Sequence, residues 1–155
     1  MPNYAPEITG VIVDLEESLL GAIMLHAQHY RTRAAINEVM SILKPSDFRG
    51  CETVDKPFQM VWRARFYYAM MVCEYPPTEL NVAIQMQKLN ILNEYDCALL
   101  ARCIYMCPCS LDYMQYAKQL KDFSVKQQVK HHADKGDLRK VRELTTIRHR
   151  KGFEI

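Results

Sequence analysis

The chain has 155 residues and a mass of 18.1 kDa, with 49% hydrophobic and 25% charged residues. This is the size and composition of a single globular domain, long enough to bury a core without disulfides or a structural metal. Five glycines and seven prolines exclude a collagen-like or low-complexity chain, and the apolar content excludes extended disorder.

The net charge of +2 is distributed unevenly along the chain. Residues 1–117 hold nine Lys/Arg and thirteen Asp/Glu, a net charge of −4, whereas residues 118–155 hold eleven and five, a net charge of +6. Such a basic tail can meet an acidic partner or nucleic-acid phosphate, or it can be an ordinary solvated helix face.

The sequence contains no signal-peptide pattern and no apolar run of transmembrane length, so we expect a cytoplasmic protein that makes no membrane contact. Thiols remain reduced in that compartment. We therefore expect the six cysteines to be buried or half-buried free thiols: Cys51, Cys73, Cys97, Cys103, Cys107 and Cys109.

Apolar residues recur with the 3.6-residue period, which predicts an all-α fold: a compact bundle of six to seven helices with a C-terminal helical hairpin. The first helix is expected over residues 14–30, with Asp14 as its N-cap. Gly21 lies inside it. Glycine in a helix is less favourable than alanine by about 1 kcal/mol, so we expect another helix to cross closely there.

The second helix ends before Pro45, and residues 45–57 are predicted to form a loop.

A long aromatic helix from Phe58 to Cys73 is the predicted centre of the core. Thr78 is expected to cap the next helix. The buried stripe of that helix is predicted to consist of Val82, Ala83, Met86 and Leu89. A further helix is expected over residues 99–107.

Ser110 is the expected N-cap of a helix that runs to about Ala133, where Lys135-Gly136-Asp137 predicts a turn into a last helix. The apolar content falls after Phe123. We therefore divide the chain into a helical bundle, residues 1–123, and a basic C-terminal hairpin, residues 124–155.

Motifs for nucleotide chemistry are absent from the sequence, which has neither G-x-x-x-x-G-K-[ST] nor G-x-G-x-x-G. A di-metal centre would need two Glu-x-x-His motifs and further carboxylates. His26 and His29, which follow Glu16 and Glu17, have no second copy of such a motif. No metal site is predicted there.

The cysteines at 103, 107 and 109 lack the second close pair that a zinc site needs, and Cys107-Pro108-Cys109 is not a C-x-x-C redox motif. No nucleophile accompanies the adjacent His131 and His132. The sequence therefore predicts no catalytic residue, no cofactor and no metal. A small helical enzyme is accordingly the least supported function class.

Several segments, taken in order, carry a family resemblance. They are LEESLLGAIML at 15–25, AAINEVMSILKPSDF at 34–48, FQMVWRARFYYAMM at 58–71, PPTELNVAIQMQKL at 76–89 and CPCSLDYMQYAKQL at 107–120. This order resembles the N-terminal domain of DnaB-type replicative DNA helicases over about residues 8–123, and KGDLRKV at 135–141 is similar to the hairpin that closes that domain.

The sequence also departs from the family pattern. Asp14 stands where the family usually has Glu, Thr78-Glu79 replaces an expected Asp, and no Gly-Gly precedes Tyr95. These departures indicate a divergent member, whose partner specificity does not follow from the resemblance.

The resemblance implies a non-catalytic interaction module of DNA replication, like the helicase collar that mediates subunit association and contacts primase or a loader. Expected partners are another copy of the chain, as a dimer or trimer of dimers, and a replicative helicase, primase or loader. DNA would be contacted only indirectly or weakly. The sequence shows no linker helix and no motor fold after Gly152, so we expect no ATP hydrolysis or unwinding.

The predicted docking surface combines apolar residues that bury against a partner with cations that set register and association rate. It consists of Phe123, Val129, Lys130, Leu138, Arg139, Val141, Arg142 and Leu144. The alternative is a nucleic-acid-binding protein that acts through the same basic hairpin.

Overall fold

The structure is a computed structural model that describes residues 6–51, 55–134, 136, 139 and 142–145. All regular secondary structure in these residues is helical, which confirms the predicted all-α fold. The α-helices are α1 (Pro6–Tyr30), α2 (Ala34–Met40), α3 (Trp62–Val72), α4 (Glu79–Lys88), α5 (Asp96–Met106) and α6 (Tyr113–Asp134). Three short 3-10 helices are η1 (Pro45–Asp47), η2 (Pro57–Gln59) and η3 (Ser110–Asp112).

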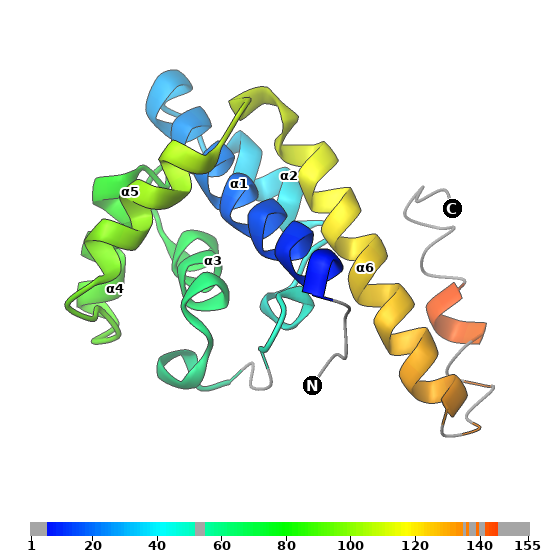
Figure 1. The fold of residues 1–155 in the computed structure, drawn as a ribbon. Helices are drawn as coiled ribbons and strands as arrows, with labels where there is room; N and C mark the ends of the chain where they lie inside the picture. Colours follow the sequence, from blue (N-terminus) through cyan, green and yellow to red (C-terminus); the bar gives the residue numbers. More distant parts are fainter. Residues whose placement is uncertain (1–5, 52–54, 135, 137–138, 140–141, 146–155) are drawn as a thin grey trace.

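Helix α1 is the centre of the bundle (Figure 1). It packs against α5 and α6, and also contacts α2, α3 and α4. Helices α3 and α4 pack together beside α5, whereas α6 follows α1 and α2 on the other side. The described part of residues 139–145 lies near the far end of α6 (Figure 1).

The first helix begins two turns earlier than its capping motif predicted. Asp14 was the expected N-cap, but α1 starts at Pro6, and Asp14 lies within the helix. Ile12 is buried and continues the apolar stripe ahead of Asp14, so burial extends the helix toward the N-terminus.

The close approach predicted at Gly21 is confirmed. A Cβ atom added to Gly21 would lie 2.0 Å from the carbonyl oxygen of Cys103 and 3.0 Å from the Cβ atom of Cys107. Helices α1 and α5 therefore cross with their backbones nearly in contact, and only glycine fits at this position.

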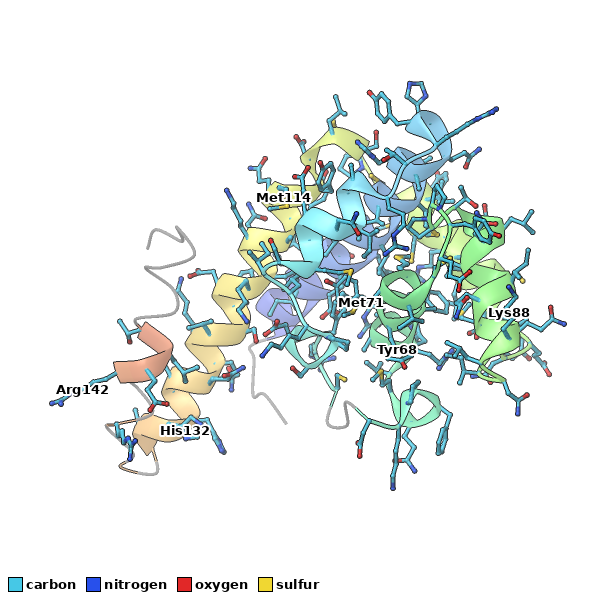
Figure 2. All side chains as sticks on the ribbon, turned by 180° about the vertical axis from the view of Figure 1, so that it is seen from behind. Tyr68, Met71, Lys88, Met114, His132 and Arg142 are labelled. Carbon is cyan, nitrogen blue, oxygen red and sulfur yellow. The ribbon has the colours of Figure 1, made fainter. Side chains whose placement is uncertain are left out.

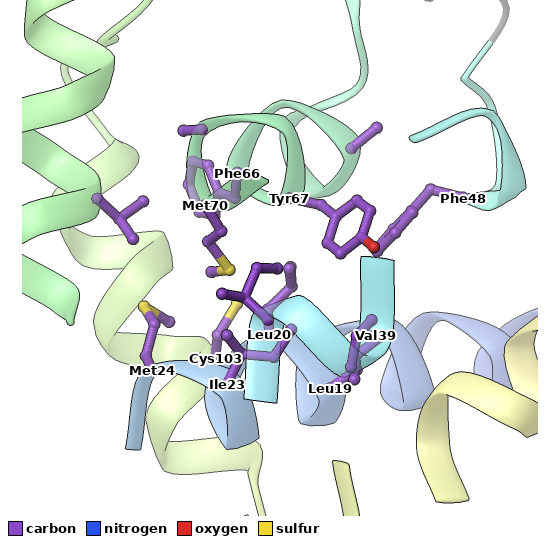
Figure 3. Packing of buried hydrophobic residues seen from close by; sticks show 14 of the residues in the cluster. Leu19, Leu20, Ile23, Met24, Val39, Phe48, Phe66, Tyr67, Met70 and Cys103 are labelled. Carbon is purple, nitrogen blue, oxygen red and sulfur yellow. The ribbon is translucent and has the colours of Figure 1, made fainter. Parts of the chain in front are cut away.

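The core is built around the aromatic helix α3 (Figure 3). Phe66 and Tyr67 are fully buried, and the Tyr67 ring packs against Phe48 with centroids 5.0 Å apart. The Tyr67 hydroxyl donates a hydrogen bond to the carbonyl of Leu43 at 2.9 Å, so the only polar atom of this side chain is satisfied. Phe66 and Tyr67 are therefore core residues.

The predicted start of this helix was wrong. Phe58 lies in the separate 3-10 helix η2 and is 65% exposed. Met60 and Val61 then adopt extended backbone angles, so the helical path is interrupted before Trp62.

Of the two other predicted caps, one is confirmed and one is wrong. The Thr78 hydroxyl accepts a hydrogen bond from the backbone N–H of Asn81 at 3.1 Å, as an N-cap does. Ser110 caps nothing, because the extended residue is Cys109 and Ser110 already belongs to the 3-10 turn that leads into α6.

Two buried ion pairs cross-link the bundle. Arg63 Nε lies 2.6 Å from Glu16 Oε1, joining α3 to α1, and Arg65 Nη2 lies 2.7 Å from Asp96 Oδ1, joining α3 to α5. Desolvation by burial raises the pKa of Glu16 above its ordinary value, against the hydrogen bond from the Arg49 amide and the charge of Arg63. These pairs are part of the core and fix how the helices cross.

Candidate protein–protein interface

Helix α6 has a buried first half and an uncovered second half. Ala117, Leu120 and Val125 are buried against the bundle. From Lys126 to Ala133 every side chain is exposed or only half-buried. The predicted boundary between residues 123 and 124 falls inside this continuous helix. The segment expected to dock on a partner therefore begins in the same helix that packs on the bundle.

The predicted docking residues have different environments. Val129 is half-buried, and Phe123 is half-buried against the core of its own chain. Leu144 is only 6% exposed, so its own chain already covers it. Lys130, Arg139 and Arg142 are exposed, whereas Leu138 and Val141 lie outside the described residues. Among the described residues of this surface, the cations are exposed and Val129 is half-buried.

The exposed cations are the main feature of this end of the molecule. Lys126 pairs with Asp122 at 2.8 Å, one helical turn earlier, and Arg139 lies 3.6 Å from Glu143. Figure 2 shows the Arg142 side chain pointing away from the ribbon. Exposed pairs of this kind contribute little to stability, so the carboxylates of an acidic partner can compete for Lys126 and Arg139.

A buried polar cluster anchors α6 to the body. Asp47, in η1, accepts a hydrogen bond from the Ser124 hydroxyl at 2.7 Å, and its carboxylate lies 3.2 Å from the ammonium of Lys121. The backbone N–H of Lys44 donates to the other carboxylate oxygen at 2.8 Å. This cluster fixes the direction in which the second half of α6 leaves the bundle.

An apolar groove between α4 and α5 was not predicted. A pocket of about 440 Å³ is lined by residues of α4, α5 and the end of α1: Gln28, Thr78, Glu79, Leu80, Ala83, Cys97 and Leu100. Leu80 is 68% exposed at its rim, and Ile84 follows one turn later. Of the predicted stripe of α4, Val82 and Met86 are buried, and Ala83 and Leu89 are half-buried against the core. The missed signal was a second apolar pair, Leu80 and Ile84, off that stripe.

His26 and Glu17, which were considered as metal ligands, make contacts within the helical bundle. His26 packs between the rings of Tyr30 and Tyr113, at 4.6 and 5.1 Å, and burial lowers its pKa against the charge of Glu38. Glu17 is buried at the α1–α5 crossing, 2.9 Å from Arg102 Nε. Within the described residues, no group of three or more His, Cys, Asp or Glu is placed to hold a metal ion.

All six cysteines are free thiols. Burial raises the pKa of Cys103 to about 12, helped by the nearby Glu17 carboxylate, and burial also raises the pKa of Cys107. Cys97 is exposed, contrary to the prediction, because it lies in the first turn of α5 at the open groove. A thiol with a raised pKa is a poor nucleophile, so Cys103 serves packing.

The described helices include none that combines the length and the apolar character needed to cross a lipid bilayer. Together, the crossing at Gly21, the aromatic core and the projecting α6 define a small all-helical domain. No protein-family model and no curated protein sequence matches the chain.

Among solved structures, the fold is similar to the N-terminal domain of DnaB helicase from Mycobacterium tuberculosis, with a TM-score of 0.56 and 17% sequence identity. The match covers 88% of this chain and 94% of that domain. The resemblance found in the sequence is thus confirmed at the level of the fold.

Proposed function

We propose that this protein is a non-catalytic protein–protein interaction module of DNA replication. The observation that carries the proposal is the fold match, which extends over nearly the whole of a helicase N-terminal domain and most of this chain. The ordered segment motifs agree with it. In the helicases that the sequence resembles, this domain associates with neighbouring subunits and with primase.

The docking surface in this proposal is the second half of α6 with residues 139–145, where Lys130, Arg139 and Arg142 are exposed. Cations at the rim of an interface mainly accelerate association and fix its register. Half-buried Val129 supplies apolar contact area beside them. Self-association, or binding to a replicative helicase, primase or loader, would use this surface.

The test is to measure the mass of the purified chain by sedimentation equilibrium, and its binding to the replicative helicase and to the C-terminal domain of primase by calorimetry. The charge-reversal variant K130E/R139E/R142E is expected to weaken the interaction at least tenfold. The matched control, K56E/K88E/K118E, reverses three exposed lysines away from this surface and is expected to leave the interaction unchanged. A monomeric chain that binds none of these proteins would contradict the proposal.

The second candidate, nucleic-acid binding, is favoured by the same cluster of exposed cations. Binding to phosphate releases condensed counterions, so its affinity would fall steeply as salt rises. Docking of apolar surface would be much less sensitive to salt. A titration with duplex and single-stranded DNA at two salt concentrations distinguishes the two functions.

A further inference from the structure

The groove between α4 and α5 has apolar walls that its own chain leaves partly uncovered. Leu100 is buried in its wall, Ala83 is half-buried, and Leu80 is exposed at its rim. Ile84 continues the exposed apolar rim one turn after Leu80. The volume of about 440 Å³ falls within the range, roughly 300–1,000 Å³, of pockets that bind other molecules. Exposed apolar surface around such a groove is typical of an interaction site.

A single charged residue lines this groove among the described residues: Glu79, in the first turn of α4. Its half-buried carboxylate forms no salt bridge with any residue that the structure describes. Lys88, the basic residue of α4, lies at a different pocket together with Glu74. The groove therefore suits a partner that offers a cation beside apolar atoms.

The second half of α6 has this complementary character. From Lys126 to Ala133 the chain holds two lysines, two histidines and no acidic residue. Lys126, Val129, Lys130 and Ala133 follow the i, i+3, i+4, i+7 spacing, so they lie along one side of the helix. Val129 is half-buried and the other three are exposed. Each lysine adds the apolar methylene groups of its side chain beneath the ammonium group.

The two surfaces also match in spacing and length. Leu80 and Ile84 are four residues apart on α4, and Val129 and Ala133 are four residues apart on α6. Rows of side chains with this spacing interdigitate when two helices cross. The segment from Lys126 to Ala133 extends about 12 Å and α4 about 15 Å, at 1.5 Å per residue, so the groove can take this segment of α6 along its length.

The groove and the second half of α6 lie at opposite ends of the molecule (Figure 1). The view from behind shows the same separation, with Lys88 at the end of α4 on one side and His132 of α6 on the other (Figure 2). One chain therefore cannot bring the two surfaces together, whereas two copies can. Such a contact leaves one groove and one α6 unoccupied, so it can continue into a closed ring or an open chain.

We infer that the second half of α6 of one copy docks in the α4–α5 groove of another copy. Val129 then lies on Leu80, and a flanking lysine brings its ammonium group to the Glu79 carboxylate. The inference rests on the proposed function, in which this half of α6 is a docking surface, and names the surface that receives it. The two contacting surfaces differ, unlike those in a symmetric pairing of α6 with α6.

The test is sedimentation equilibrium of the wild type, of L80E and of K126E/K130E, each alone, and of the two variants mixed. All three substitutions are at exposed helix positions, and each variant keeps the other surface intact. Each variant alone is expected to self-associate at least about tenfold more weakly than the wild type, since a negative charge meets Glu79 or enters an apolar contact. L111E, at an exposed leucine of η3 outside the groove, is the control and associates as the wild type does.

The mixture of the two variants is the decisive sample. L80E still offers an intact α6, and K126E/K130E still offers an intact groove. The equimolar mixture is therefore expected to form a one-to-one dimer that grows no further. A symmetric contact between two α6 helices would instead leave L80E as associated as the wild type and would give no complementation.

Cys97 reports on the groove directly, because its exposed thiol lies in the groove wall. Its rate of alkylation by iodoacetamide, followed by mass spectrometry of the peptide that contains it, is expected to fall as the concentration of the wild-type chain rises. The rate for K126E/K130E is expected to stay constant over the same concentrations, because no α6 covers the groove.

The outcomes separate this inference from the proposed function. L80E that associates as the wild type does, or a mixture that does not dimerise, overturns the inference and leaves α6 as a docking surface for another site. A wild-type chain that stays monomeric also overturns it, and binding to helicase or primase then tests the proposed function alone. If L80E weakens that binding in a monomeric chain, the groove holds a different protein and the inference is wrong.

Discussion

The α-carbon of Gly21 faces the main-chain carbonyl of Cys103 so closely that a methyl group there would lie 2.0 Å from the carbonyl oxygen. The obstacle is backbone, which cannot rotate away as a side chain can. Helices α1 and α5 therefore rest on each other along this line, and Glu17, one turn earlier on α1, is buried at the same crossing.

Replacing Gly21 by alanine is expected to destabilise the protein by at least about 2 kcal/mol, because the two helices must separate. Gly10 lies in the same helix with nothing within 4 Å of an added Cβ atom. Gly10→Ala is expected to stabilise by up to about 1 kcal/mol, since alanine is the better helix former. Urea unfolding of both variants measures the difference. Similar effects of the two substitutions would contradict the crossing.

The anchor of α6 at Asp47 gives a second prediction. Asp47→Ala leaves Lys121 and Ser124 without their buried acceptor, and about 3 kcal/mol of stability is expected to be lost. Lys126→Ala breaks only an exposed pair with Asp122 and is expected to change stability by less than about 1 kcal/mol.

Hydrogen exchange locates the effect of Asp47→Ala. Amides of α6 from residue 117 to 130 are expected to exchange faster relative to those of α3, because α6 loses its link to η1. Uniformly faster exchange over the whole bundle would show that Asp47 supports global stability rather than the position of α6.

Alkaline pH is expected to destabilise the fold through Tyr67 and Cys103. Burial, followed by the nearby Asp47 carboxylate, raises the pKa of Tyr67 well above its ordinary 10, and burial raises the pKa of Cys103 from 9 to about 12. Between pH 9 and 12 the unfolded chain releases protons that the folded chain retains. The free energy of unfolding therefore falls as pH rises, by up to about 1.4 kcal/mol per pH unit for each group.

Tyr67→Phe separates the phenol from other titrating groups. It is expected to lower stability near pH 7 by about 1 kcal/mol, through loss of the hydrogen bond to Leu43, and to reduce the alkaline slope above pH 10. Tyr105→Phe is the control, since Tyr105 is 89% exposed and its slope should match the wild type. Denaturant unfolding at a series of pH values provides both numbers.

The sequence predicted features whose signal is local. Gly21 stands out because glycine weakens a helix unless a neighbour requires it, and Thr78 is identified by a short-range bond to Asn81. The prediction of Asp14 as an N-cap was wrong because a good capping residue can also lie inside a helix. Here Ile12, two residues before Asp14, is buried, and the helix includes both residues. Local preference decides a boundary only where burial does not.

The polar parts of the structure could not be predicted from spacing. Arg63 meets Glu16 across 47 residues, and Ser124 meets Asp47 across 77. Periodicity assigns residues to faces but does not say which charges on different helices meet.

The buried pair of Arg63 and Glu16 gives the last prediction. Arg63→Met keeps aliphatic contact area but removes the charge that is paired with the buried Glu16 carboxylate. Glu16 then keeps only the amide and the charge of Arg49, so its pKa is expected to rise further than burial already raises it. A carboxyl whose pKa is raised in the folded state stays protonated above pH 4.5, the ordinary pKa of Glu. Its contribution to stability is lost as pH rises through the folded pKa. Arg63→Met is therefore expected to lose about 3 kcal/mol or more at pH 8 and clearly less at pH 5.

The double variant Glu16→Gln/Arg63→Met removes the uncompensated charge together with its partner. It is expected to be more stable than Arg63→Met at pH 8, with a stability difference from wild type that hardly changes between pH 5 and 8. Urea unfolding of the wild type, the two single variants and the double variant at both pH values gives the coupling energy. The prediction fails if Arg63→Met loses the same stability at both pH values and the double variant is no more stable than Arg63→Met. Glu16 is then not ionised in the folded Arg63→Met protein at pH 8.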